Sequence, residues 1–173
     1  GFSCVCPATY YFKYNKDSDD ENKERKFETD NKNNPISYIF TIESCGNYDK
    51  KEIINVALNT LKDKLLIIKK DIEDDLGLKV KLYKSNTKFD AMDILLENEN
   101  DTISNLLTDS INEDEDIKYC GYDIPHPLKN KAILRISYKD NEKQQIVNLI
   151  SSNIDKIIEL IDKFEKDWNE KSS

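Results

Sequence analysis

Two long stretches of the chain carry apolar residues at the spacing of an amphipathic helix. The first follows Asp49, which forms a variant of a capping box with Glu52, and its pattern ends before Gly77. The second covers residues 141–169. Both stripes have heptad-like spacing, so each helix is expected to pack against a partner. The stripe positions are Ile54, Leu58, Leu61, Leu65, Ile68 and Ile72 in the first helix, and Ile146, Ile150, Ile154, Ile157, Ile161, Phe164 and Trp168 in the second.

Runs rich in β-branched and aromatic residues predict strands around these helices. The last run alternates clearly, with Ala132, Leu134, Ile136 and Tyr138 on one face. The stretch 15–35 contains almost no apolar residue, which predicts a solvated, disordered loop. The runs cover residues 2–14, 37–44, 78–83, 89–96, 117–124 and 132–138.

A short helix is predicted between the fourth and fifth of these strands. Asp101 can cap its N-terminus, and an apolar face follows at Ile103, Leu106, Leu107 and Ile111. This helix is expected to pack on the sheet.

A proline-rich corner separates the last two strands. Pro125 and Pro127 cannot donate hydrogen bonds to a sheet ladder, and each favours an extended residue before it. We therefore predict a stiff, extended crossover instead of a tight turn, with Gly121, Pro125, His126 and Pro127 as its structural residues.

The two strand-then-helix units resemble one another. Residues 52–57 (EIINVA) and 145–150 (QIVNLI) place Asn55 and Asn148 at the same point of an apolar frame, after a strand of similar length. This repeat predicts a tandem pseudo-dimer in which two related halves bury their helical stripes together.

The composition of the chain limits which partners and which cellular compartment are expected. The 173 residues carry a net charge of −8, which argues against direct nucleic-acid binding. No apolar run is long enough for a membrane span, and residues 1–4 do not form a signal-peptide pattern. Four cysteines are too few for a disulfide scaffold, so a reducing compartment is expected.

No group of residues predicts catalysis or a cofactor. Cys4 and Cys6 form C-x-C, but the other two cysteines stand alone, so small core residues are favoured over a zinc site. His126 is the only histidine and is flanked by prolines. Asp114 and Asp116 fit a solvated acidic turn better than a magnesium site, and a Gly-rich phosphate loop is absent from the sequence.

The stretch 121–128 (GYDIPHPL) resembles a motif of the small assembly subunits of multisubunit RNA polymerases: the eleventh subunit of polymerase II, its counterpart in polymerases I and III, and the archaeal L subunit. In that family the motif precedes a strand and a long C-terminal helix ending near Trp, as at Trp168. Residues 99–106 resemble the family's Glu-Asp-His-Thr-Leu-Gly-Asn helix start, with Asp101, Ile103 and Ser104 replacing His, Leu and Gly. The resemblance covers residues 88–170.

The first half resembles the end of the larger partner, the third subunit of polymerase II or the archaeal D subunit. The similar stretches are 2–10 (FSCVCPATY) and 40–46 (FTIESCG). Both partners are similar to the bacterial α-subunit dimerisation module. Their combination in one chain resembles the fused subunit of large cytoplasmic DNA viruses, and the Asn-, Lys- and Ile-rich composition fits an AT-rich genome. The opening strand, first helix and inserted domain of the larger partner have no counterpart, so a C-terminal fragment is expected.

The resemblance implies an α+β fold: a tandem pseudo-dimer of α-like dimerisation modules, with mixed or antiparallel strands packed on two long helices. It divides the chain into residues 1–76 (D-like), a connector at 77–87 and residues 88–173 (L-like). The alternative from residues alone is a generic coiled-coil-like adaptor.

The implied function is non-catalytic assembly of a DNA-directed RNA polymerase, with no cofactor. The partners would be the large polymerase subunits and other small assembly subunits. The implied docking residues are Asp101, Thr102, Ser104 and Asn105. The implied location is the viral factory in the host cytoplasm and the virion, or otherwise the nucleus or cytoplasm.

Overall fold

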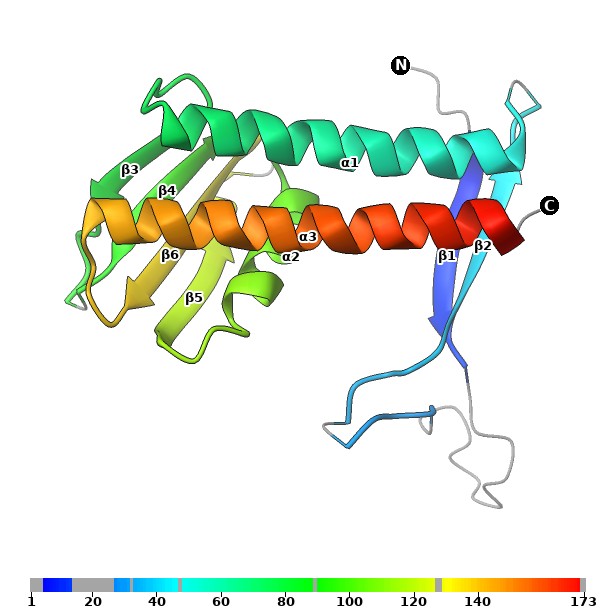
Figure 1. Ribbon diagram of the computed structural model, residues 1–173, viewed down its shortest axis with the longest axis horizontal. Helices are drawn as coiled ribbons and strands as arrows, with labels where there is room; N and C mark the ends of the chain where they lie inside the picture. The colour runs from blue at the N-terminus through cyan, green and yellow to red at the C-terminus, as the bar shows by residue number, and fades with distance from the viewer. Residues whose placement is uncertain are drawn as a thin grey trace. The chain divides into compact units, whose positions relative to one another are not determined.

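A computed structural model describes residues 5–13, 27–31, 33–46, 48–88, 90–126 and 129–171 (Figure 1). The chain forms two compact units, residues 1–55 and 56–173, and each is described by itself. The division between the units falls inside helix α1 (Lys50–Glu73).

The N-terminal unit contains a two-stranded antiparallel ribbon. Strand β1 (Val5–Phe12) pairs with β2 (Tyr38–Ser44), with an irregularity between Val5 and Ala8. Because side chains alternate along a strand, Tyr10, Phe12, Tyr38 and Phe40 share one face, where their rings contact one another at centroid distances from 5.4 to 6.5 Å. Tyr10, Tyr38 and Phe40 are exposed.

The predicted loop at residues 15–35 is only partly described, since residues 15–26 and 32 lie outside the described ranges. The described part is not a free loop, which corrects the prediction for these residues. The N–H of Glu28 donates to the Lys13 carbonyl (3.2 Å), and that of Ile36 donates to the Glu28 carbonyl (3.0 Å). The Phe27 ring lies 4.9 Å from that of Phe12. This segment therefore continues the ribbon.

The C-terminal unit contains a four-stranded antiparallel sheet in the order β3-β4-β6-β5. Its strands are β3 (Val80–Lys84), β4 (Met92–Glu97), β5 (Ile117–Asp123) and β6 (Lys131–Tyr138). The predicted strand regions are confirmed with small differences at their ends. The alternation predicted for β6 is also confirmed, because Ala132, Leu134 and Ile136 are buried.

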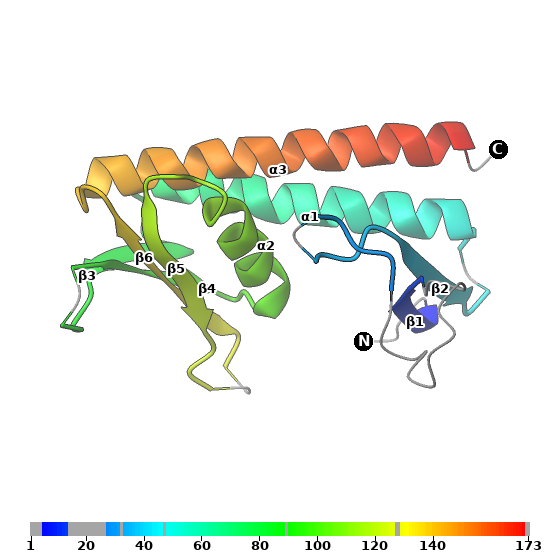
Figure 2. The same ribbon diagram turned by 90° about the horizontal axis from the view of Figure 1, so that it is seen from below.

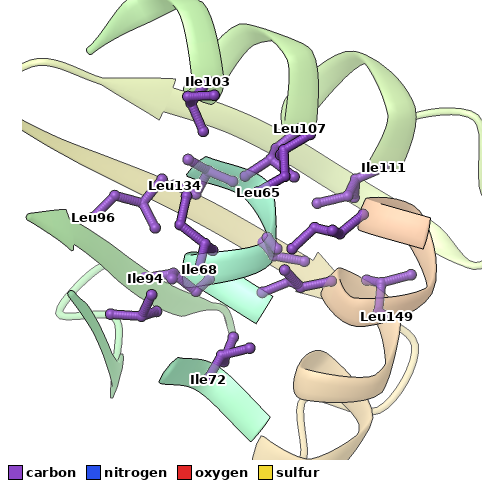
Figure 3. Close-up of a cluster of buried hydrophobic side chains, with 14 of the residues drawn as sticks. Leu65, Ile68, Ile72, Ile94, Leu96, Ile103, Leu107, Ile111, Leu134 and Leu149 are labelled. Atoms are coloured by element: carbon purple, nitrogen blue, oxygen red, sulfur yellow. The ribbon is translucent and has the colours of Figure 1, made fainter. Parts of the chain in front are cut away.

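Three helices meet one face of this sheet. Helix α2 (Asp101–Ile111) and helix α3 (Lys143–Lys171) both contribute buried residues to the core, as does α1 from Leu65 onward. Figure 2 shows α1 and α3 side by side along one side of the sheet. Figure 3 shows their side chains converging with those of β4 and β6. The labelled members of this core are Leu65, Ile68, Ile72, Ile94, Leu96, Ile103, Leu107, Ile111, Leu134 and Leu149.

A buried carboxylate fixes the link from α1 to β3. The Asp71 side chain accepts hydrogen bonds from the backbone N–H groups of Leu78, Lys79 and Val80, at 3.1, 2.8 and 2.6 Å. Between them the chain reverses through Gly77, whose φ of 64° suits glycine. Leu78 and Lys79 therefore precede the strand instead of opening it, which is why β3 starts later than predicted.

Candidate assembly interface

Helices α1 and α3 run antiparallel and are joined by ion pairs. Lys62 contacts Asp162 at 3.0 Å and Glu165 at 2.7 Å, and Lys69 contacts Asp155 at 2.6 Å. The hydrogen bond to Glu165, and then that to Asp162, raises the pKa of Lys62 above its ordinary value. The hydrogen bond to Asp155 likewise raises the pKa of Lys69. These pairs hold the two helices in one register.

The two apolar stripes differ in how far they are covered. Most predicted positions lie inside: Leu65, Ile68, Ile150, Ile154, Ile157 and Ile161 are buried, and Ile54, Leu58, Leu61 and Trp168 are half-buried. Phe164 is different, because 54% of its surface is exposed. The stripe of α3 thus continues past the packed core into solvent.

A groove lies where this exposed stripe meets α1 and α2. Its volume is about 310 Å³, and its apolar lining residues are Leu58, Leu106, Ile157, Leu160, Ile161 and Phe164. Leu160 is 66% exposed. Asp109 and Glu113 lie at its polar rim. The predicted stripe omitted Leu160, although its spacing from Ile157 and Phe164 is helical.

The start of α2 differs from the prediction at its cap. Asn100, and not Asp101, is the N-cap residue: its side-chain oxygen accepts the N–H of Thr102 at 3.2 Å. Asp101, Thr102 and Asn105 are exposed, and Asn105 donates to the Asp109 carboxylate at 3.3 Å. Three of the four predicted docking residues therefore lie together on the surface.

Ser104 is fully buried, at 0% exposure, so the expectation that it faces a partner is wrong. The reason is helical geometry, since Ser104 shares a face with Leu107, Thr108 and Ile111, three, four and seven residues later. Its hydroxyl has no hydrogen-bond partner among the described residues. A small residue is needed here for packing, and a large one at this position would disrupt the core.

The predicted corner divides into two separate features. Gly121 is not part of it, because it lies within β5 opposite Arg135. Pro125 and His126 follow the strand, and the His126 carbonyl accepts the N–H of Lys129 at 3.0 Å. Pro127 lies outside the described residues. Because β5 and β6 are antiparallel neighbours, the segment is a wide hairpin connection and not a crossover.

A buried amide was missed by the sequence reasoning. Asn153 is 0% exposed within the stripe of α3; it accepts from Ser110 of α2 at 2.9 Å and donates to the Leu149 carbonyl at 2.8 Å. A polar residue one position before Ile154 was the available signal. This pair fixes α2 against α3.

The described residues contain no cluster of three or more potential metal ligands. Burial raises the pKa of the Cys120 thiol to about 11, although the Thr108 hydroxyl opposes this, so Cys120 is a core residue and a poor nucleophile. Cys45 is exposed, while Cys4 and the side chain of Cys6 lie outside the described set. No described helix is long and apolar enough to cross a membrane.

Comparisons with known proteins relate the C-terminal part of the chain to a family. Residues 91–167 match the RNA polymerase Rpb3/Rpb11 dimerisation domain. The chain is similar to "DNA-directed RNA polymerase II subunit RPB11" of Schizosaccharomyces pombe, with 32% identity over 96 residues, which cover 54% of this chain and 78% of that protein. The matched part contains β4, α2, β5, β6 and most of α3.

Two further proteins are similar to this chain at lower sequence identity. "Probable DNA-directed RNA polymerases I and III subunit RPAC2" of Caenorhabditis elegans is 26% identical over 82 residues, 46% of this chain and 57% of that protein. The solved structure of RNA polymerase subunit L from Thermoplasma acidophilum aligns with 53% of this chain and 92% of its own, at 18% identity and a TM-score of 0.38. By its similarity to RPB11, this chain belongs to the Rpb3/Rpb11 dimerisation-domain family of RNA polymerase subunits.

Proposed function

We propose that this chain is a non-catalytic assembly subunit of a DNA-directed RNA polymerase, which helps to bring the large catalytic subunits together. The RPB11-like match over residues 91–167 carries the proposal. That match includes α2 and α3, two of the three helices that line the exposed groove at Leu160 and Phe164. An open apolar groove with a polar rim is typical of a surface that binds another protein.

Purification of the tagged chain from its source cells tests this function. We expect the two large polymerase subunits to co-purify in stoichiometric amounts, with transcription activity that depends on them. Recovery of unrelated proteins in their place would support the adaptor alternative. A small molecule bound to the chain with no large subunit would point to an enzyme.

We also propose the tandem pseudo-dimer, and the ion pairs of α1 and α3 support it. The offset between Asn55 and Asn148 is 93 residues. Applied to Lys62 this offset leads to Asp155, and applied to Lys69 it leads to Asp162. The observed ion pairs are crossed with respect to this offset: Lys69 pairs with Asp155, and Lys62 pairs with Asp162. In a two-fold interface, residue i contacts j wherever j contacts i, and these two pairs follow that rule.

Under this proposal residues 1–76 form the D-like half, 77–87 the connector and 88–173 the L-like half. Joining the halves in one chain raises their effective concentration and removes most of the entropic cost of association. The Asp71 hydrogen bonds then fix the start of the connector, directly after the first half.

We propose that Asp101, Thr102 and Asn105 contact a large subunit. All three are exposed and polar, and they lie beside the start of α2. The variant Thr102→Arg with Asn105→Arg keeps the buried face of α2 intact, so the isolated chain should stay folded while polymerase reconstitution is blocked. The matched control is Asn59→Arg with Thr60→Arg on the exposed side of α1. Equal reconstitution by both variants would mean that this surface is not the docking face.

A viral origin is a further proposal, resting on the resemblance of residues 2–10 and 40–46 to the larger partner. It assigns the chain to the cytoplasmic viral factory and the virion. Mass spectrometry of purified virions tests it: the chain should be present in amounts equal to the large polymerase subunits. Its presence only in uninfected nuclei or cytoplasm would contradict the viral assignment and leave the polymerase proposal standing.

A further inference from the structure

The face of the four-stranded sheet turned away from the core has no described helix over it (Figure 2). Strand register places Tyr83, Asp93, Arg135 and Gly121 in one row across all four strands of this outer face. The ends of the row are aromatic, because the Tyr119 ring lies over Gly121. A Cβ atom on Gly121 would be 2.9 Å from Cζ of Tyr119.

An ion pair occupies the middle of the row. Nε and Nη2 of Arg135 donate to Oδ1 and Oδ2 of Asp93, each at 2.7 Å. Asp93 is only 5% exposed, so its charge is neutralised by Arg135. An arginine has five N–H donors and this pair uses two. The side chain of Arg135 remains 39% exposed, so its other donors can reach a partner.

Two hollows on this face share Tyr119 and Arg135 as lining residues. One, of about 100 Å³, lies over Gly121 and is bordered by Asp123 and Ile133. The other extends from Tyr119 over Ser137 to Ala91, with Lys118 at its side. The smaller hollow has space for one aliphatic side chain. Tyr119 itself is 56% exposed and offers a ring face for contact.

The edge of the sheet beside these hollows is partly closed to strand addition. The Cys120 carbonyl of β5 accepts a hydrogen bond from the Asn112 side chain at 3.2 Å. Edge groups that are already bonded cannot pair with an added strand. A partner at this position would therefore bind through side chains on the outer face.

The charge of these hollows is opposite to that of the chain. Arg135 is balanced by Asp93, and Asp90 lies 3.7 Å from the Lys84 ammonium. The remaining lining charges are those of Lys88, Lys118 and Asp123, a small positive excess on a chain that carries −8. Neither Lys88 nor Lys118 has a carboxylate within 4 Å among the described residues. The Lys118 ammonium donates to the Lys139 carbonyl at 3.3 Å and can still bind an anion.

We infer that the part of this outer face around Tyr119, away from Tyr83, is a second docking surface, separate from the start of α2, and that it binds an acidic segment of another protein. An aliphatic side chain of the partner enters the hollow over Gly121 against Tyr119 and Ile133. Carboxylates of the same segment bind Lys118 and the remaining donors of Arg135. A nucleic acid fits less well, because its affinity rests on many cations that neutralise phosphates, and these hollows offer only Lys88 and Lys118 beyond the paired Arg135.

Site-specific photocrosslinking tests the inference in the native complex. Benzoylphenylalanine replaces Tyr119 in one full-length tagged variant and Tyr83, the exposed tyrosine at the other end of the row, in a matched control. After irradiation in source cells, position 119 should crosslink to an acidic segment of another chain, and position 83 should not. Equal crosslinking from both positions, no crosslink from position 119, or a crosslink to nucleic acid would overturn the inference.

Binding of the crosslinked segment as a synthetic peptide then checks the contacts. Gly121→Ala displaces the Tyr119 ring into the hollow, and Lys118→Glu reverses one charge, so each should weaken binding to the folded chain about tenfold, the scale of one well-made contact. Tyr83→Ala should leave the affinity unchanged. Unchanged affinity in all three variants would also overturn the inference. The polymerase proposal is judged separately, by whether the large subunits co-purify.

Discussion

The two strand pairs that precede the long helices, β1–β2 and β5–β6, are both antiparallel but have different surroundings. The pair β5–β6 lies within a four-stranded sheet, and its inward residues Cys120, Leu134 and Ile136 are buried. The ribbon β1–β2 has two strands, and Tyr10 and Phe40 on its aromatic face are exposed. The same alternation of apolar residues thus produces a core in one unit and an open surface in the other.

The two units differ physically in how much other secondary structure each supplies to bury the apolar residues of its strands. In the C-terminal unit α2 contributes Ile103, Leu107 and Ile111 to the core. An isolated two-stranded hairpin is marginal in water, because it cannot bury enough apolar area to offset the cost of ordering its backbone. Ring contacts contribute about 0.5–1.5 kcal/mol per pair, so they order the ribbon only weakly. The exposed aromatic face is consistent with the proposed assembly role.

The largest expected effect comes from a charge placed inside the core. Ile157→Asp should lower the free energy of unfolding by about 4 kcal/mol or more, because a carboxylate would replace a buried aliphatic group. Leu160→Asp, three residues later on the same helix, should change it by less than about 0.5 kcal/mol, since that side chain is exposed. Urea denaturation followed by circular dichroism measures both. Equal losses would show that the groove is closed in solution.

The next effect concerns the link between α1 and β3. Asp71→Ala would leave three backbone N–H groups without their acceptor and should cost about 3 kcal/mol. Asp63→Ala, an exposed position on the same helix, is the control. Amide hydrogen exchange should speed up at residues 78–80 and stay unchanged in the ribbon. Unaltered protection of these amides would contradict the role of Asp71.

A smaller effect is expected in the ribbon. Phe40→Ser removes ring contacts with Tyr10 and Tyr38 at 5.9 and 6.5 Å, and should cost about 1 kcal/mol of local stability. Hydrogen exchange should accelerate in β1 and β2 while the cooperative unfolding of the C-terminal unit is retained. Loss of that cooperative transition would mean that the two units do not unfold independently.

The smallest expected effect comes from removing the ion pairs between α1 and α3. Lys62→Ala and Lys69→Ala should each cost about 0.5 kcal/mol, because both pairs are near solvent. Since both lysines have raised pKa values in the folded state, their stabilisation is fully present below their ordinary pKa of 10.5. It is lost as the pH rises above that value through the folded-state pKa. Thermal melts at pH 8 and pH 11 measure the difference, and equal effects of both substitutions would support the proposed two-fold relation.

The spacing of apolar residues was sufficient to predict the helices and strands and most of the core residues. The buried positions Leu65, Ile68, Ile154 and Ile157 follow from spacing alone, because a helical stripe has to face an apolar layer. Ser104 shows the limit of such reasoning. Its side chain is polar, so sequence reasoning placed it at the surface, while the helix phase places it beside Leu107 in the core. The sequence prediction likewise assigned the cap of this helix to Asp101, whereas the extended backbone at residue 100 makes Asn100 the N-cap.

The sequence by itself determined where helices and strands form and which family the C-terminal half resembles, because local periodicity and the motif at residues 121–128 depend on adjacent residues. Only the tertiary structure decided which parts of the stripes stay exposed, how Asp71 binds the backbone between α1 and β3, and that Tyr119 lies over Gly121. These features join residues from different elements. Their contacts depend on strand register and helix phase in three dimensions, which no local pattern specifies.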